Sequence, residues 1–417
     1  MNSDAAVGGP ARSASRAAEV FRVFLRLGVT SFGGPVAHLG YFREELVVRR
    51  RWASEAQYAE LLALCQFLPG PASSQLGFAL GLLRGGPLGA VAAWTAFTLP
   101  SALLIVLFAV GAVSLDGPLG SGLVLGLQAV AVAVVAHAVW GMARTLAPEL
   151  RRILIAAAAA ALALLVPGGL GQLVAIPVGL LAGIVCCRTG AEGPAEPLAV
   201  RVPRRAGFAA LLAVGLLLAG LPILARVTHD PWAAIADAFT RAGALVFGGG
   251  HVVLPLLQAE PAIAAAVPPE RFLAGYGAAQ ALPGPLFAFA AFLGFEMQPG
   301  PAAPLGALLA LVAVFAPGLL LLVGVLPFWE RLRGRWAARA ALAGANAAVV
   351  GILAAALWDP VIRTGVTGVA PALIAAGCLL LLVGGRLPVW AVVLAGAVGG
   401  VLAGLLGAGT GAGAAWA

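Results

Sequence analysis

Phe24-Leu25-Arg26-Leu27-Gly28-Val29-Thr30-Ser31-Phe32-Gly33-Gly34 lies near the start of this chain, and a second version, Phe239-Thr240-Arg241-Ala242-Gly243-Ala244-Leu245-Val246-Phe247-Gly248-Gly249, lies past its middle. The two versions share both phenylalanines, the arginine and all three glycines at a constant shift of 215 residues. In each, the arginine stands inside an apolar run that ends in Phe-Gly-Gly. Self-similarity at a fixed offset indicates a fold built from two copies of one unit.

Two further matches in the same order support the duplication. Gln66-Phe67-Leu68-Pro69-Gly70-Pro71 returns 214 residues later as Gln280-Ala281-Leu282-Pro283-Gly284-Pro285. Gly126, Ala129 and Trp140 return 218 residues later as Gly344, Ala347 and Trp358. Because the offset drifts so little, internal duplication is the strongest inference from the sequence.

The composition excludes a water-soluble globule. Of the 417 residues, 61% are hydrophobic and 10% are charged, whereas soluble domains are about half apolar and about one quarter charged. The apolar runs are continuous rather than alternating, which favours spanning helices over an outer-membrane barrel. The predicted fold class is an all-α polytopic membrane protein with two homologous repeats in inverted orientation, in which some segments are broken or re-entrant.

Thirteen apolar segments are predicted along the chain. They cover about residues 20–41, 56–84, 88–113, 119–143, 153–167, 170–187, 206–226, 232–259, 271–297, 302–328, 337–358, 364–384 and 388–408. They divide the chain into a cytoplasmic N-terminal tail (1–19), a first repeat (20–187), a linker with an unmatched helix (188–231, helix 206–226) and a second repeat (232–417).

The unmatched helix predicts the relative orientation of the copies. If each repeat crosses the membrane an even number of times, helix 206–226 turns the second copy upside down. Inverted repeats are typical of secondary transporters, whose substrate site lies between the repeats near mid-membrane. Arginine-rich loops are expected in the cytoplasm. The loop at 43–52 satisfies this rule if the first two segments are re-entrant hairpins, although two full crossings leave the later topology unchanged.

Both repeated motifs predict interrupted helices. An interruption at membrane depth frees backbone groups, which are tolerated only where they line a protected cavity, and half-helix N-termini attract anions. Taken singly, each motif fits the general abundance of Gly and Pro in membrane helices, but their repetition in register favours a substrate site. The candidate binding residues at the breaks are Phe32, Gly33, Gly34, Pro69, Gly70, Phe247, Gly248, Gly249, Pro283 and Gly284.

Polar side chains near the breaks extend this candidate site. Arg26 and Arg241 lie within apolar segments, where a charge implies a partner, a water cavity or an anion, and two guanidinium groups suit a tetrahedral dianion. Alternatively, both arginines snorkel to an interface, or Arg241 pairs with Asp237 one turn earlier. Gln66, Gln280, Ser73 and Ser74 are further candidates, which could instead bridge helices.

Other function classes lack support in the sequence. We find no HExxH, no acidic cluster, no Cys/His ligand set and no GxxxxGK[ST] motif. An enzyme, a bound metal, a cofactor and ATP-driven pumping are therefore not expected. No nucleic-acid partner is expected, the lipid bilayer is the expected surroundings, and a homodimer stays open.

Two blocks of the sequence resemble the two domains of the chromate ion transporter family. The first block, residues 21–85, contains Leu27-Gly28-Val29-Thr30-Ser31-Phe32-Gly33-Gly34-Pro35 and Cys65-Gln66-Phe67-Leu68-Pro69-Gly70-Pro71-Ala72-Ser73-Ser74-Gln75. The second, residues 239–296, contains Phe247-Gly248-Gly249-Gly250-His251-Val252-Val253-Leu254-Pro255 and Gly275-Tyr276-Gly277-Ala278-Ala279-Gln280-Ala281-Leu282-Pro283-Gly284-Pro285. The resemblance covers nearly the whole chain, in the long two-domain form.

The resemblance implies a bacterial inner-membrane protein that exports chromate and confers chromate resistance. It also implies sulfate as a competing substrate and protons as the coupling ion. A transporter of another anion, such as sulfate or molybdate, is the alternative. Export of a dianion from an inside-negative cell is electrically downhill, by about 7 kcal/mol at roughly 150 mV. We therefore expect alternating access, with chromate held between the two pairs of broken helices.

Overall fold

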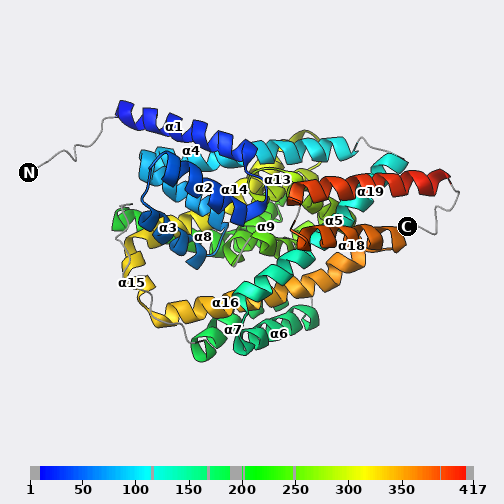
Figure 1. Cartoon of the computed structure of the whole chain (residues 1–417). Helices are drawn as coiled ribbons and strands as arrows, with labels where there is room; N and C mark the ends of the chain where they lie inside the picture. Colours follow the sequence, from blue (N-terminus) through cyan, green and yellow to red (C-terminus); the bar gives the residue numbers. More distant parts are fainter. Residues whose placement is uncertain are drawn as a thin grey trace, which may run out of the picture.

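The protein, described by a computed structural model, is built of helices, with no β-strand among residues 10–113, 117–166, 170–187, 200, 202–247, 250–385 and 387–409, which the structure describes. Figure 1 shows how these helices are arranged. The α-helices are α1 (Pro10–Thr30), α2 (Gly34–Phe42), α3 (Glu55–Phe67), α4 (Ala72–Val113), α5 (Pro118–Leu146), α6 (Leu150–Leu165), α7 (Leu170–Cys186), α8 (Arg204–Thr228), α9 (Pro231–Leu245), α10 (Val253–Gln258), α11 (Pro261–Ala266), α12 (Pro269–Ala281), α13 (Phe289–Met297), α14 (Ala303–Val325), α15 (Trp329–Arg333), α16 (Trp336–Ala356), α17 (Arg363–Gly365), α18 (Val369–Val383) and α19 (Val389–Gly409). Short tighter or wider helical turns are η1 (Arg43–Arg49), η2 (Gly250–Val252), η3 (Leu286–Ala288), η4 (Gly300–Ala302), η5 (Leu326–Phe328) and η6 (Leu357–Ile362).

Several of these helices have the length and composition of membrane spans. Within the described residues, six helical stretches are long and apolar enough to cross a bilayer by length and composition, the first of which turns back at Gly86: Ala72–Gly111, Leu119–Leu146, Arg204–Thr228, Gly300–Leu332, Trp336–Gly365 and Val389–Leu406. Shorter apolar helices accompany them at Leu170–Cys186, Leu286–Met297 and Val369–Val383. The predicted class, an all-α polytopic membrane protein, is confirmed.

The long helix α4 is two helices folded back on each other. Gly86 has φ +65° and ψ −159°, which no helix allows, and the following residue is Pro87. A methyl group added at Gly81 would lie 2.5 Å from the Gly89 carbonyl oxygen and 2.7 Å from Ala93 Cβ. In a continuous helix, eight residues span about 12 Å. The chain therefore reverses at Gly86, between the second and third predicted segments.

Helices are interrupted at all four repeated motifs, as the sequence predicts. In the first copy α1 stops at Thr30 and α2 starts at Gly34, and α3 stops at Phe67 and α4 starts at Ala72. In the second copy α9 stops at Leu245 before η2, and α12 stops at Ala281 before η3. Proline lacks an N–H and glycine allows positive φ, so both residue types end helices at these points.

Each interrupted pair of helices forms a returning hairpin. We name these hairpin 1 (residues 19–50), hairpin 2 (52–85), hairpin 3 (231–260) and hairpin 4 (269–297), and call the break of each its tip and the opposite end its mouth. Phe24 of α1 packs edge-on against Phe42 of α2, with ring centroids 5.5 Å apart. Arg84 stacks over Trp52, 5.6 Å from the ring centroid. Arg241 contacts Glu260 across hairpin 3, and Arg271 contacts Glu296 across hairpin 4.

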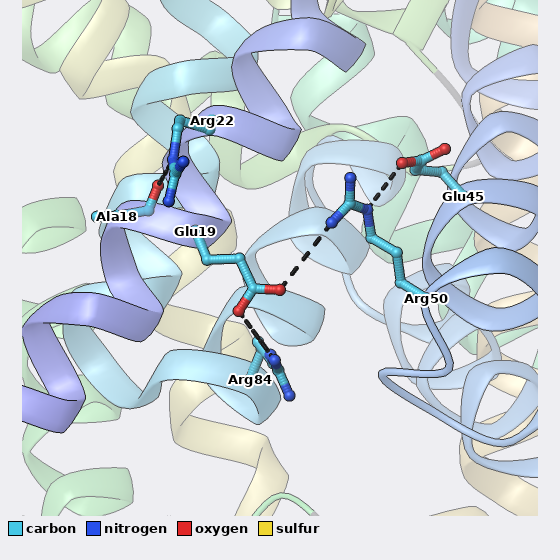
Figure 2. Close-up of polar contacts among 6 residues, drawn as sticks. All are labelled: Ala18, Glu19, Arg22, Glu45, Arg50 and Arg84. Carbon is cyan, nitrogen blue, oxygen red and sulfur yellow. Dashed lines mark hydrogen bonds and ion pairs between the residues drawn. The ribbon is translucent and has the colours of Figure 1, made fainter.

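An ionic cluster joins the mouths of hairpins 1 and 2. Glu19 binds Arg84 at 2.9 Å and approaches Arg50 at 4.0 Å, and Arg50 binds Glu45 at 2.7 Å (Figure 2). Glu19 lies in the middle of α1, Glu45 lies in η1, Arg50 directly follows η1, and Arg84 lies in the last turn before Gly86. The two hairpins of the first copy therefore open toward the same side.

The later helices of the two copies are exchanged. Gly126 of α5 meets the backbone of Gly396 and Gly400 on α19, and its repeat counterpart, Gly344 of α16, meets Gly179 and Gly183 on α7. Figure 1 shows α19 and α18 beside α5, and α16 beside α6 and α7. Small residues let helix backbones approach closely in membranes. Each copy therefore completes its packing only with helices of the other.

Candidate functional site

The four hairpin tips meet at the centre of the molecule through two exchanged hydrogen bonds. The backbone N–H of Gly70 donates to the carbonyl of Val246 at 2.7 Å, and the N–H of Gly284 donates to the carbonyl of Ser31 at 2.9 Å. Gly70 and Gly284 are repeat counterparts, and so are Ser31 and Val246. Each Pro-Gly-Pro turn thus binds the Phe-Gly-Gly break of the other copy. Such reciprocal contacts define a local two-fold relation.

The two glycine-rich breaks also touch. A methyl group added at Gly250 would lie 3.2 Å from Cγ of Pro35, the residue that follows the first Phe-Gly-Gly. Both of these hydrogen bonds between hairpins of different copies lie at the tips. Copies that enter a bilayer from opposite sides produce contacts of this kind. The geometry therefore supports the predicted meeting of the interrupted helices.

Left-handed backbone conformation explains the glycine in each Pro-Gly-Pro turn. Gly70 has φ +122° and Gly284 has φ +92°, values that L side chains rarely adopt. A methyl group at Gly70 would lie 2.9 Å from the Gly318 Cα, and one at Gly284 would lie 2.9 Å from Ser101 Oγ. Both turns therefore require glycine for two reasons: the backbone has positive φ, and a neighbouring atom leaves no room for a Cβ.

Buried polar atoms without a protein partner border these breaks. Among the described residues, they include the hydroxyl oxygens of Ser31, Ser74 and Thr98, and the amide of Gln280 interacts with the Tyr276 hydroxyl. Ser31 lies in the tip of hairpin 1, Ser74 in the first turn after the second break, and Gln280 just before the fourth. Buried polar groups normally find partners. Hydroxyl and amide N–H groups of this kind can bind the oxygens of an anion.

Two of these residues, Ser31 and Thr98, were not singled out from the sequence. Thr98 is 1% exposed and lies beside Phe97 on the second arm of α4, close to Gly284. The one sign of Thr98 in the sequence was that it is a polar residue within an apolar helix. Sequence spacing alone could not show that this part of α4 lies next to the fourth break. Gln75 acts differently, since its amide donates to the carbonyls of Pro69 and Gly318 at 3.0 and 2.9 Å.

The remaining predicted site residues differ in their surroundings. Ser73, Pro283 and Gly284 are buried, Pro69 and Phe247 are half-buried, and Gln66 is exposed. Phe32 is half-buried against Trp390, with ring centroids 5.9 Å apart. Gly33 and Gly34 both have positive φ, +101° and +75°. Gly248 and Gly249 lie outside the described residues.

The two predicted arginines are not equivalent in the structure. Arg241 is bound by two carboxylates, Asp237 at 3.1 Å and Glu260 at 2.5 Å, so the helical ion pair weighed as an alternative is present. Arg26 is exposed on α1, and it interacts electrostatically with Glu45, the repeat counterpart of Glu260. The structure does not bring Arg26 and Arg241 into contact with each other.

Broken helices from two copies, meeting tip to tip within a polytopic helical protein, define a membrane transport protein of the interrupted-helix class. The chain belongs to the chromate transporter family, whose model matches residues 18–185 and again residues 233–401. Helix α8 lies outside both matched ranges.

Relatives of this chain carry transporter names. A chromate transport protein of Pseudomonas aeruginosa is 30% identical over 351 residues, covering 82% of this chain and 80% of that protein. A chromate transport protein of Cupriavidus metallidurans is 28% identical over 341 residues, covering 80% of each. An uncharacterized transporter of Methanocaldococcus jannaschii is 24% identical over 77% of this chain and 79% of its own length. No solved structure gives a significant match.

Proposed function

We propose that this protein exports chromate from the cytoplasm of a bacterial cell across the inner membrane by alternating access, with its N-terminus in the cytoplasm. The observation that carries the proposal is the pair of exchanged hydrogen bonds, Gly70 to Val246 and Gly284 to Ser31, which bring four helix breaks together. Backbone groups freed at such breaks are suited to an ion at mid-membrane depth. Family membership and the names of its relatives supply the substrate.

In the proposed site, chromate lies between the tips of the hairpins. Its oxygens accept hydrogen bonds from Ser31, Ser74 and Thr98, whose buried hydroxyl oxygens lack protein partners, and from the amide of Gln280. The glycines at the breaks let backbone approach the anion without a Cβ in the way. Arg26 contributes positive charge from the helix that leads into the first break, whereas the charge of Arg241 is offset by Asp237 and Glu260. Sulfate, also a tetrahedral dianion, is expected to compete.

The membrane potential favours export. Moving one charge through 100 mV is worth about 2.3 kcal/mol, so a dianion leaving an inside-negative cell gains about 7 kcal/mol at roughly 150 mV. Uptake would need at least about two co-transported cations to offset the same potential. Export alone is enough to lower the cytoplasmic chromate concentration, and it would confer resistance.

Chromate flux into everted membrane vesicles tests this proposal, because the cytoplasmic face of such vesicles points outward. We expect energised vesicles to accumulate chromate, with Ser74→Ala and Gln280→Leu reducing uptake at low chromate about tenfold or more, the cost of about one lost hydrogen bond to a charged group. Ser121→Ala is the matched control, since Ser121 is an exposed hydroxyl on α5.

Arg26→Ala and Arg241→Ala separate the roles of the two arginines. Loss of flux with normal expression would support a contribution of that arginine to the anion site, and normal flux would remove it from the site. Sulfate or molybdate accumulation without chromate accumulation would contradict the proposed substrate and leave the architecture of the site intact.

A further inference from the structure

One buried cluster in the second copy has an unbalanced charge. Asp237 and Glu260 are each 7% exposed, and both bind the same nitrogen, Nη2 of Arg241. Asp237 forms its ion pair with Arg241 through Oδ2, whereas its other carboxylate oxygen, Oδ1, is buried and has no hydrogen-bond partner. Two ionised carboxylates beside one guanidinium leave a net charge of minus one. A buried uncompensated charge is costly, and a bound proton removes it.

The equivalent positions in the first copy have the opposite charge balance, with two basic residues and one acidic residue. The counterparts of Asp237, Arg241 and Glu260 are Arg22, Arg26 and Glu45. Glu45 is bound by Arg49 and Arg50, and Arg22 is exposed. The duplication therefore supplied the same scaffold twice, and at these three positions only the second copy has two carboxylates and one arginine. This asymmetry is not required by packing, because the first copy forms the same hairpin without it.

An open cavity lies beside this region and is bordered by the chain neighbours of Glu260. It has a volume of about 380 Å³ and is lined by Gln258, Ala259 and Pro261 on either side of Glu260, and by Gln172 and Asp359 from neighbouring helices. The amide oxygens of Gln172 and Gln258 are buried and have no protein partner. A cavity of this size holds water beside these two amide oxygens. Water there lies next to Ala259 and Pro261, the chain neighbours of Glu260, and is a source of a proton for the cluster.

The surroundings of the cluster contribute little further charge. Helices α10, α11 and α14, which pack against α9, have no ionisable residue. Arg226 at the end of α8 acts electrostatically on Asp237, but it is exposed, where water screens it. Arg271 and Glu296 at the mouth of hairpin 4 neutralise each other. His229 and Asp230 lie at the start of α9, and His251 of η2 is bound to Tyr276.

We propose that Asp237, Arg241 and Glu260 form a proton-binding site, in which one proton from the cavity is shared by the two carboxylates and favours anion binding at the hairpin tips. Arg241 lies five residues before Val246, whose carbonyl accepts the Gly70 N–H, a distance of about 7 Å along a helix. With its proton the cluster is neutral, and without it the cluster repels a dianion. Proton and anion therefore bind with positive, reciprocal coupling. The coupling rests on the proposed function.

Two measurements on the purified full-length protein test this inference. Infrared titration should show a protonated carboxyl group near neutral pH, and Asp237→Asn and Glu260→Gln should each remove its band. Calorimetric chromate binding should tighten about fivefold or more from about pH 9 to about pH 7, within the usual range of allosteric coupling. Both variants should lose this pH dependence. Glu296→Gln is the control, because Glu296 forms a one-to-one ion pair with Arg271. This variant should keep both the infrared band and the pH dependence of chromate binding.

The outcomes distinguish the two proposals. If folded Asp237→Asn and Glu260→Gln proteins keep the carboxyl band and the pH dependence of the unmodified protein, the proton site is overturned. If the unmodified protein binds no chromate at any pH, the proposed function fails, and the infrared band alone decides the proton site. If one substitution prevents folding, the other variant still decides the result, because each carboxylate is required for the shared proton.

Discussion

At the scale of single residues, the glycine of each Pro-Gly-Pro turn is the position with the least freedom to change. Gly70 and Gly284 combine positive φ, an exchanged hydrogen bond and close contact with the opposite copy. Proline on either side removes N–H groups, which makes the glycine N–H the donor that joins the two copies. The backbone of this one glycine thus sets the turn, forms the contact between the copies and shapes the proposed anion site.

Gly70→Ala and Gly284→Ala are expected to reduce both stability and chromate flux. Left-handed conformation costs a non-glycine residue about 1–2 kcal/mol, and the added methyl group clashes 2.9 Å from its neighbours in each case. Thermal unfolding in detergent and vesicle flux measure the two effects. Gly377→Ala, in the middle of α18 with open space around it, should leave both unchanged. Equal behaviour of all three variants would contradict the role of the tips.

At the scale of elements, the unit of the structure is the returning hairpin rather than the straight spanning helix. Aromatic packing between Phe24 and Phe42 holds the arms of hairpin 1 together, and an ion pair closes the mouth of hairpin 4. Because the arms return, Arg50, which follows η1, lies beside Glu19 of α1. This arrangement is compatible with the re-entrant alternative that the placement of arginines suggested, which stays a prediction.

Glu19 is the residue on which the ionic cluster of the first copy depends. It contacts both Arg84 and Arg50 (Figure 2), so Glu19→Gln should loosen hairpins 1 and 2 together. We expect a loss of about 0.5–1 kcal/mol, which shrinks at high salt because the groups are partly exposed. Thermal unfolding at low and high salt measures it. Arg22→Gln, one turn along the same helix, should have a smaller effect, since Arg22 donates only to the Ala18 carbonyl there.

At the scale of the whole molecule, the two copies are intertwined. Helix α5 packs on α19 and helix α16 packs on α7 through glycine contacts, and the tips exchange hydrogen bonds. Neither copy has a complete packing surface without the other. The predicted boundaries divide the sequence into two repeats. In the folded protein, helices of one repeat pack against helices of the other across these boundaries.

Separate expression of the two halves tests this exchange. A chain ending at about residue 187 and a chain starting at about residue 200 should each be degraded when made alone, because α5 and α16 would expose glycine-rich faces. Co-expression should restore chromate flux. Stable insertion and folding of either half alone, measured by protease resistance in membranes, would contradict the intertwined arrangement.

The inverted orientation of the copies stays a prediction, which cysteine labelling can test. After replacement of the four native cysteines, single cysteines at Arg49 and at Gln298 mark the mouths of the first and second copies. In intact cells we expect an impermeant reagent to label position 298 and not position 49, and in everted vesicles the reverse. Labelling of both positions from one side would place the copies in parallel.

Much of the fold followed from local sequence because its causes are local. Continuous apolar runs require helices in lipid, and Gly and Pro end those helices wherever they occur, so the four breaks were predictable at 33–34, 69–71, 248–249 and 283–285. The repeat offsets also identified which breaks correspond. Gln280 and Ser74 were found as polar residues beside a break. Thr98 was not, because its role depends on the neighbouring arm of α4.

The sequence by itself determined a duplicated, helical membrane protein with paired interruptions, since hydrophobicity and backbone conformation act within a few residues. Only the tertiary structure decided which break meets which, that Arg241 is shared by Asp237 and Glu260, and that α19 completes the packing of α5. The contacts between the breaks and between α5 and α19 join residues far apart in the sequence, and Glu260 reaches Arg241 from the other arm of hairpin 3, 19 residues away. Which residues meet in these contacts depends on the shape and charge of surfaces that form only in the folded protein. Such contacts produce no periodic pattern in the sequence.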